Sequence, residues 1–204
     1  MRRTKEDAEK TRNALLAAAE QLFLEKGVAH TSLEQIARAA QLTRGAVYWH
    51  FQNKAHLFHE MLDQVRLPPE ELARRLSGCT GQDPLRLLRD LCVEAIENLA
   101  RHEQKRRIFT ILLHRCEFTD ELREAEQRHL AFIRRFIDLS EQLFSAAASR
   151  LQPGVSARLA SRALHAQLIG LFTDWTRDPS LFDPLQDTAN LIDAQFRGLV
   201  RDWQ

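Results

Sequence analysis

Arg44, Gly45, Tyr48 and Trp49 are the residues of this sequence best suited to bind another molecule. A globular helix normally exposes Lys, Glu and Gln to water, so a Gly beside two aromatic rings on an outward face indicates a contact surface. An Arg guanidinium can donate paired hydrogen bonds to guanine or phosphate, and a Tyr hydroxyl can donate to a phosphate oxygen. A Gly in the first turn allows another backbone to approach closely. This chemistry is typical of a helix that enters the major groove of DNA.

Two short helices at an angle are predicted to position these side chains. Thr31 and Ser32 supply capping hydroxyls for a helix over 33–40, and Glu34 follows Thr31 by three residues to complete a capping box. The spacing of the apolar residues then predicts a single buried face, made of Leu33, Ile36, Ala37 and Ala40.

The second helix is predicted over 44–50, with Thr43 as its cap and Val47 and Phe51 pointing inward. Between residues 33 and 54 the only acid is Glu34, against the basic residues Arg38, Arg44 and Lys54. This local basic excess favours contact with phosphate, although the formal net charge of the whole chain is only +1.

The segments T-S-L-E-Q-I-A, T-R-G-A-V-Y-W-H-F and N-K resemble the signature of TetR-family transcriptional repressors, and the match runs from about Thr11 to Val65. The resemblance implies an all-α protein with an N-terminal three-helix, helix-turn-helix DNA-binding domain and a larger helical domain that binds a ligand and dimerises. The segment L-L-H-R-C-E-F, Leu112 to Phe118, is similar to the subgroup that represses multidrug efflux operons. Family members usually carry Gly where this chain has Gln41, and in a left-handed backbone Gln costs about 1 kcal/mol more than Gly.

By position, the resemblance implies DNA contacts of two kinds. Contacts to the sugar-phosphate backbone, including a phosphate at a helix N-terminus, are expected from Thr31, Ser32, Tyr48, His50 and Lys54. Contacts to base edges and thymine methyl groups are expected from Thr43, Arg44, Gly45 and Trp49. Structural alternatives remain: His50 can be a packed histidine, and Tyr48 and Trp49 can fill a seam between domains.

The chain is predicted to divide into a DNA-binding domain over 1–53 and a ligand-binding and dimerisation domain over 54–204. Asn53 is expected to cap a connecting helix over 54–66, which we interpret as the lever between the domains. The helices of the first domain are predicted over about 6–26, 33–40 and 44–50.

Composition and cysteine usage exclude several classes of protein. Of the residues, 44% are hydrophobic and 28% charged, and no apolar run approaches the roughly eighteen residues of a membrane span. The first thirty residues lack the apolar core of a signal peptide, so we expect a cytoplasmic protein without a membrane partner. No Gly-rich phosphate loop occurs, and no cofactor is expected. Cys79, Cys92 and Cys116 lack paired spacing, so neither a disulfide framework nor a metal site is predicted.

The segment from Ala163 to Thr173 contains no charged residue, and such a helix requires burial on two sides. One stripe consists of Leu164, Leu168, Leu171 and Trp175, and the other of Leu159, Ala163, Ala166 and Phe172. One stripe can meet the core and the other a second subunit, together with a last helix over about 188–203. The four-helix dimer interface usual in the family is predicted to use Leu164, Leu168, Leu171, Leu191, Phe196 and Leu199.

The resemblance also implies a mostly apolar cavity for a small-molecule inducer. Candidate lining residues between the fourth and eighth helices are Leu62, Arg66, Phe109, Leu113, His114, Phe132, Phe136 and Trp175. Aromatic residues at helical spacing are equally typical of a plain core. In the same way, His129 and Ser140 are either satisfied core groups or hydrogen-bonding groups inside a cavity.

We interpret the chain as a homodimeric repressor of a palindromic operator, released by a small, hydrophobic, antimicrobial-like ligand and controlling a multidrug efflux operon. Ligand binding would favour a conformation whose reading helices no longer fit major grooves about 34–36 Å apart.

Three alternatives remain open. A redox-sensing repressor would use Cys116 as a thiol of lowered pKa. An enzyme would need His114, Cys116 and Glu117 to converge, which positions 114 and 116 of one helix do not do. A helical adaptor that binds only protein has no use for Arg44, Gly45 and Tyr48.

Overall fold

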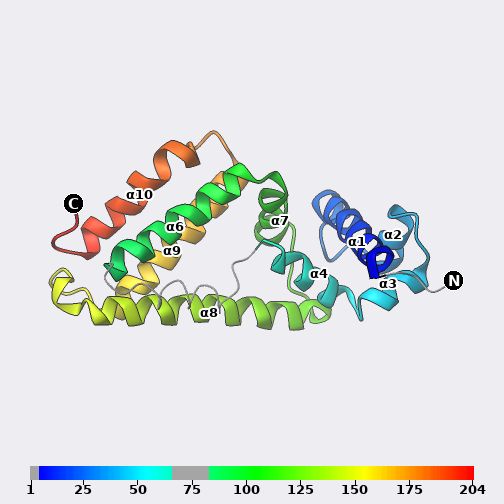
Figure 1. Ribbon diagram of the computed structural model, residues 1–204, viewed down its shortest axis with the longest axis horizontal. Helices are drawn as coiled ribbons and strands as arrows, with labels where there is room; N and C mark the ends of the chain where they lie inside the picture. Colours follow the sequence, from blue (N-terminus) through cyan, green and yellow to red (C-terminus); the bar gives the residue numbers. More distant parts are fainter. Residues whose placement is uncertain (1–4, 66–82) are drawn as a thin grey trace. The chain divides into compact units, whose positions relative to one another are not determined.

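The computed structural model describes residues 5–65 and 83–204, and every regular element in these ranges is a helix (Figure 1). The elements before the gap are α1 (Lys5–Lys26), α2 (Leu33–Ala39), α3 (Arg44–His50) and α4 (Lys54–Asp63). After it come α6 (Pro84–Arg101), α7 (Glu103–His114), η1 (Asp120–Leu122), α8 (Arg123–Ala146), η2 (Ala148–Arg150), α9 (Ala157–Arg177) and α10 (Pro184–Leu199). The predicted all-α fold is confirmed. Within the described ranges, no helix combines the length and apolar character needed to cross a membrane.

The contacts divide the chain into two compact units. The first unit contains α1 to α4 together with the segment 107–130, and the second contains α6, the start of α7, the rest of α8, α9 and α10. In the first unit, Phe23, Val47 and Phe58 share one core with Ile108 and Leu122. The packing therefore groups α4 with the DNA-reading helices, whereas the proposed division of domains at residue 53 stays a prediction.

Local signals set the ends of the N-terminal helices. Gly27 ends α1 with φ +85°, a left-handed conformation that favours glycine, and its N–H donates to the carbonyl of Phe23 at 2.9 Å. Gln41, in the turn between α2 and α3, has φ 56°. The left-handed backbone considered for this position is therefore present, and Gln41 carries a strain of about 1 kcal/mol relative to Gly.

The capping box of α2 lies one residue later than predicted. Ser32 is the N-cap: its hydroxyl accepts from the N–H of Gln35 at 3.2 Å, and its own N–H donates to Gln35 Oε1 at 2.8 Å. Thr31 is buried, and its hydroxyl donates to the carbonyl of Gly27 at 2.9 Å. The predicted Thr31 and Glu34 capping box is therefore wrong, because the helix begins at Leu33 and its third residue is Gln35.

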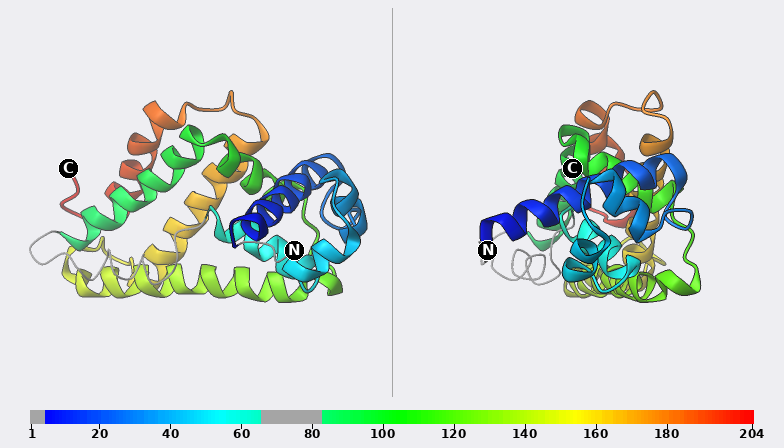
Figure 2. Two further views of the ribbon diagram at one scale, coloured as in Figure 1. Left: turned by 45° about the vertical axis from the view of Figure 1, so that its right-hand side comes forward. Right: turned by 90° about the vertical axis from the view of Figure 1, so that its right-hand side faces the viewer.

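In the second unit, α6, α9 and α10 lie side by side (Figure 2). Arg89 on α6 donates to Asp193 on α10 at 2.6 and 2.9 Å, and the indole N–H of Trp203 donates to the same carboxylate at 3.0 Å. The hydrogen bond from Arg89 is the main cause that lowers the pKa of Asp193, and the hydrogen bond from Trp203 adds to it. This cross-link fixes the register of α10 against α6.

The last helix begins and ends earlier than the predicted 188–203. Asp183 caps α10 by accepting from the N–H of Leu185 at 2.9 Å, and Pro184 occupies the first turn. Val200 is extended and pairs with Leu151 in an isolated bridge. The helix therefore stops before Trp203.

The apolar stripe chosen for the dimer interface packs inside the chain. Leu164, Leu168, Phe196 and Leu199 are buried within the second unit, and Leu171 and Leu191 are half-buried. Trp175 is buried as well, and Arg106 lies over its ring at 5.8 Å. The apolar side chains of α9 and α10 that are exposed are instead Leu159, Ala166, Leu185 and Ala194. The prediction that Leu164, Leu168, Phe196 and Leu199 form the dimer interface is therefore corrected, because these four side chains belong to the core of the second unit.

Ser140 is a satisfied core group, because its buried hydroxyl donates to the carbonyl of Phe136 at 2.8 Å. His129 belongs to the first unit, where its ring stacks on that of Phe118 with centroids 6.1 Å apart.

Candidate nucleic-acid interface

Helix α3 presents the predicted contact residues to solvent. Trp49 is 70% exposed and Tyr48 45%, and the side chain of Arg44 is 70% exposed. On the opposite side of the helix, Val47 and Phe51 are buried in the core of the first unit. The predicted orientation of α3 is confirmed within the first unit.

The start of α3 is fixed by Thr43, whose hydroxyl accepts from the N–H of Ala46 at 3.2 Å. Gly45 is exposed in the first turn, where an added Cβ would meet no atom closer than 3.9 Å. At the other end, the rings of Trp49 and His50 meet edge to face with centroids 4.5 Å apart. The helix thus offers a polar, open first turn and an aromatic last turn.

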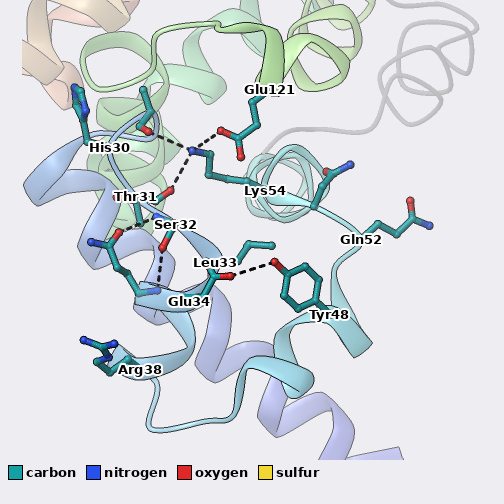
Figure 3. A pocket seen from close by; sticks show the side chains of 13 residues that line it. His30, Thr31, Ser32, Leu33, Glu34, Arg38, Tyr48, Gln52, Lys54 and Glu121 are labelled. Atoms are coloured by element: carbon teal, nitrogen blue, oxygen red, sulfur yellow. Dashed lines mark hydrogen bonds and ion pairs between the residues drawn. The ribbon is translucent and has the colours of Figure 1, made fainter.

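A concave surface that encloses a volume of about 760 Å³ adjoins α3 (Figure 3). Its lining comes from the loop before α2, from α2, from Tyr48, from the turn into α4 and the start of that helix, and from η1. It includes the hydrogen-bond donors Ser32, Arg38 and Asn53 as well as the carboxylates of Glu34 and Glu121. The donors beside the exposed helix α3 are suited to a phosphate backbone, whereas the two carboxylates oppose an anion.

Glu34 lies at the centre of a polar cluster on this surface. Its Oε1 atom lies 3.1 Å from Nη2 of Arg44 and accepts a long hydrogen bond of 3.4 Å from the hydroxyl of Tyr48. The guanidinium of Arg44 lies 5.4 Å from the centroid of the Tyr48 ring. The pKa of Glu34 is lowered, first by its own backbone N–H and then by Arg44, Ser32 and Tyr48, against an opposing effect of desolvation. The carboxylate is therefore ionised at neutral pH.

Lys54 is a structural cross-link in this structure, not a phosphate contact. Its side chain is 4% exposed, and Nζ donates to the carbonyls of Thr31 at 3.0 Å and Ala29 at 3.3 Å. The same ammonium lies 2.8 Å from Oε2 of Glu121 in η1 (Figure 3). An ammonium has three N–H donors, and three acceptors use them. The DNA-contact prediction for Lys54 is corrected accordingly, and so is that for the buried Thr31.

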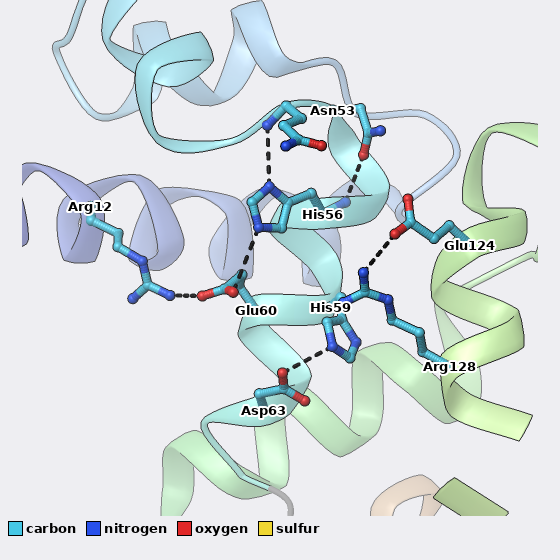
Figure 4. Close-up of polar contacts among 9 residues, drawn as sticks. Arg12, Asn53, His56, His59, Glu60, Asp63, Glu124 and Arg128 are labelled. Atoms are coloured by element: carbon cyan, nitrogen blue, oxygen red, sulfur yellow. Dashed lines mark hydrogen bonds and ion pairs between the residues drawn. The ribbon is translucent and has the colours of Figure 1, made fainter. Parts of the chain in front are cut away.

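Polar contacts connect α4 with the elements around it (Figure 4). Asn53 caps the helix by accepting from the N–H of His56 at 2.7 Å, as predicted, and the N–H of Gln52 donates to Nδ1 of His56 at 3.2 Å. Arg12 of α1 pairs with Glu60 of α4. The start of α4 is therefore tied to the preceding turn, and its second half is tied to α1.

The redox-sensing alternative finds no support at Cys116. Burial raises the pKa of the Cys116 thiol to about 12, although Lys54 acts in the opposite direction. Burial also raises the pKa of Cys92 to about 12. A redox-sensing thiol needs a lowered pKa and access to solvent. Cys79 lies outside the described residues.

The candidate ligand-lining residues fall in both units, so the predicted cavity remains a prediction. In the first unit Leu62 is buried in the core, and Phe109, Leu113 and His114 are half-buried. In the second unit Phe132 and Phe136 are half-buried and Trp175 is buried. Arg66 lies outside the described residues.

His165 on α9, which was not among the predicted ligand-lining residues, lies beside one of them. Its ring centroid lies 6.3 Å from that of Phe136, and its buried Nε2 has no hydrogen-bond partner among the described residues. Burial, with Arg162, lowers the pKa of His165, which keeps the ring neutral at pH 7. A lone His in an apolar helix gave no signal that separated it from an ordinary core residue.

The geometry is that of a helix-turn-helix with its second helix exposed, and comparison with known families agrees. Residues 15–61 match the model of bacterial regulatory proteins of the tetR family, and residues 83–201 match the C-terminal region of MAATS-type transcriptional repressors. The chain belongs to the TetR family and is a transcriptional repressor of the efflux-pump regulator type.

Three relatives illustrate the similarity. The chain is 67% identical to NalD, the secondary repressor of the MexAB-OprM multidrug efflux pump in Pseudomonas aeruginosa; the match covers 97% of this chain and 100% of NalD, with a TM-score of 0.93. It is 38% identical to the HTH-type transcriptional regulator TtgR of Pseudomonas putida, over 95% of this chain and 93% of TtgR. It is 32% identical to SmeT in the SmeT–triclosan complex; the match covers 95% of this chain and 93% of SmeT, with a TM-score of 0.80.

Proposed function

We propose that the protein binds a palindromic operator as a homodimer, controls a multidrug efflux operon, and leaves the operator when a small hydrophobic ligand binds. The observation that carries this proposal is the exposed face of α3, with Arg44, Tyr48 and Trp49 directed outward. The name of NalD supports a pump operon as the target, and the triclosan complex of SmeT supports a hydrophobic inducer. A protein with this function acts in the cytoplasm, where the chromosome lies.

The proposed DNA contacts are the exposed residues of the site together with the half-buried His50. Base edges meet Thr43, Arg44, Gly45 and Trp49, and the sugar-phosphate backbone meets Ser32, Tyr48 and His50. Two copies of α3 must reach successive major grooves about 34–36 Å apart, and a dimer supplies this spacing. We assign the dimer surface to the outward side of α9 and α10, which includes Leu159, Ala166 and Ala194.

Arg44→Ala is expected to weaken operator binding about 10- to 100-fold and to relax the preference among sequences, because a bidentate contact to a base is lost. Tyr48→Phe removes a proposed phosphate contact and no base contact, so it should weaken operator and random DNA alike, by about three-fold. Fluorescence anisotropy with an operator selected in vitro and a random duplex, at several salt concentrations, measures both effects.

Lys26→Ala, at the exposed end of α1, removes the same charge outside α3 and serves as the control. Equal losses on operator and random DNA for Arg44→Ala would contradict the assignment of Arg44 to a base edge. Binding that does not fall with salt would contradict the proposed function as a whole.

Phe136→Ala is expected to raise the triclosan concentration that releases the operator by about ten-fold or more, because the large apolar ring is a proposed contact of the inducer. Release is measured by anisotropy, and the melting temperature reports whether the variant is folded. Leu181→Ala, which truncates an exposed leucine of the second unit, is the control. A folded Phe136→Ala variant with wild-type release would exclude Phe136 from the ligand site.

A further inference from the structure

Two proposed DNA-binding groups converge on one carboxylate of the protein itself. Arg44 lies 3.1 Å from Oε1 of Glu34, and the hydroxyl of Tyr48 donates to the same oxygen at 3.4 Å (Figure 3 shows the contact with Tyr48). Glu34 is the only acidic residue between positions 33 and 54.

A guanidinium and a hydroxyl donor are groups that proteins use to hold a phosphate oxygen. Here the bound anion is the carboxylate of Glu34, on the concave surface beside α3. A DNA phosphate that approaches this surface meets donors that are already engaged, and it meets a negative charge. The internal contacts must therefore be broken, and the like charge moved aside, before Arg44 and Tyr48 can bind DNA.

We propose that Glu34 is an internal competitor of the DNA phosphate, which holds Arg44 and Tyr48 in the free protein and lowers the affinity for duplex DNA. The inference rests on the proposed function and adds a residue that sets the strength of DNA binding. The contacts with Glu34 must be broken whichever duplex Arg44 and Tyr48 bind. The same cost therefore opposes the binding of random DNA and of the operator, and it cancels in the ratio of the two affinities.

Glu34→Gln keeps the size and one hydrogen-bond acceptor of the side chain but removes its charge. With a 30-base-pair random duplex as the probe, this variant should bind about three- to ten-fold tighter than the wild type at low salt. Binding to an operator selected in vitro should tighten by a similar factor, because the displacement cost is common to both duplexes, so the specificity ratio stays close to that of the wild type. Glu34→Asp keeps the charge and should stay close to the wild type.

Glu25→Gln is the matched control, because Glu25 is an exposed acid of α1 whose partner is Gln21 and not a group of α3. It should change affinity for the random duplex by less than about two-fold. An equal gain in Glu25→Gln and Glu34→Gln would overturn the proposal, because net charge alone would then explain it. Unchanged or weaker binding of the random duplex by Glu34→Gln, with an unchanged melting temperature, would also overturn it.

A double-mutant cycle tests whether the competition acts through Arg44. In an Arg44→Ala background the gain from Glu34→Gln on the random duplex should shrink to about half or less, because Arg44 is no longer there to be released. A full gain in that background would show that Glu34 acts by repulsion alone and would overturn competition for Arg44. Failure of the wild type itself to bind either duplex would instead refute the proposed function, and this outcome is distinct from a null effect of Glu34→Gln.

Discussion

Lys54→Met is expected to lower the free energy of unfolding by about 2–3 kcal/mol, because it leaves buried acceptors without a donor. The ammonium of Lys54 serves the carbonyls of Ala29 and Thr31 and the carboxylate of Glu121. Glu121 is 57% exposed, so water can replace much of its interaction with the ammonium. The two carbonyls therefore account for most of the expected loss in the free energy of unfolding. Urea unfolding measures the change.

Glu121→Gln is the matched control and should cost less than about 1 kcal/mol, because it disturbs only the solvent-screened contact of Lys54. For the folded fraction of Lys54→Met, the slope of DNA affinity against salt should equal that of the wild type, since Lys54 gives no phosphate contact. A variant of wild-type stability whose salt slope drops by about one phosphate contact would restore the original interpretation of Lys54 as a DNA contact.

Ala166→Arg is expected to convert the proposed dimer to a monomer and to lower operator affinity by about 100-fold or more, because each reading helix would then bind its half-site separately. Ala166 is exposed on the outward side of α9, where we place the second subunit. A buried arginine without an acidic partner would oppose association. Light scattering after size exclusion gives the mass, and anisotropy gives the operator affinity.

Leu130→Arg, at an exposed leucine of α8, is the control for adding a bulky charge at an apolar surface position. It should leave the mass and the operator affinity of the dimer unchanged. A dimeric Ala166→Arg variant with wild-type affinity would show that the interface does not include this side of α9.

The local features of the fold could be read from the sequence, because their causes lie within a few residues. Thr43 and Asn53 cap the helices that they were predicted to cap. The missed start of α10 has the same Asp-Pro signal as α6, at Asp183 and Pro184, so it was available. The outward face of α3 followed from the spacing of Val47 and Phe51.

The errors arose where a distant part of the chain decides the role of a side chain. From the sequence alone, Lys54 is expected to be an exposed cation. Its burial becomes visible only in the fold, where Glu121 and the carbonyls of the loop before α2 surround the ammonium. The two stripes of α9 are equally apolar in the sequence. Only packing with α6 and α10 shows that Leu164 and Leu168 face the core. The ion pair of Glu34 with Arg44 was missed because it joins two helices whose angle no local pattern specifies.

The core shared by α1 to α4 and the segment 107–130 bears on how this repressor can be dissected. A fragment that stops at residue 65 lacks Ile108, Ile111 and Leu122, and it would leave the apolar faces of Phe23 and Phe58 partly uncovered. Helices α1 to α4 therefore do not form a complete folding unit without the segment 107–130. A chimaera that joins these helices to the ligand-binding domain of another protein must also include that segment.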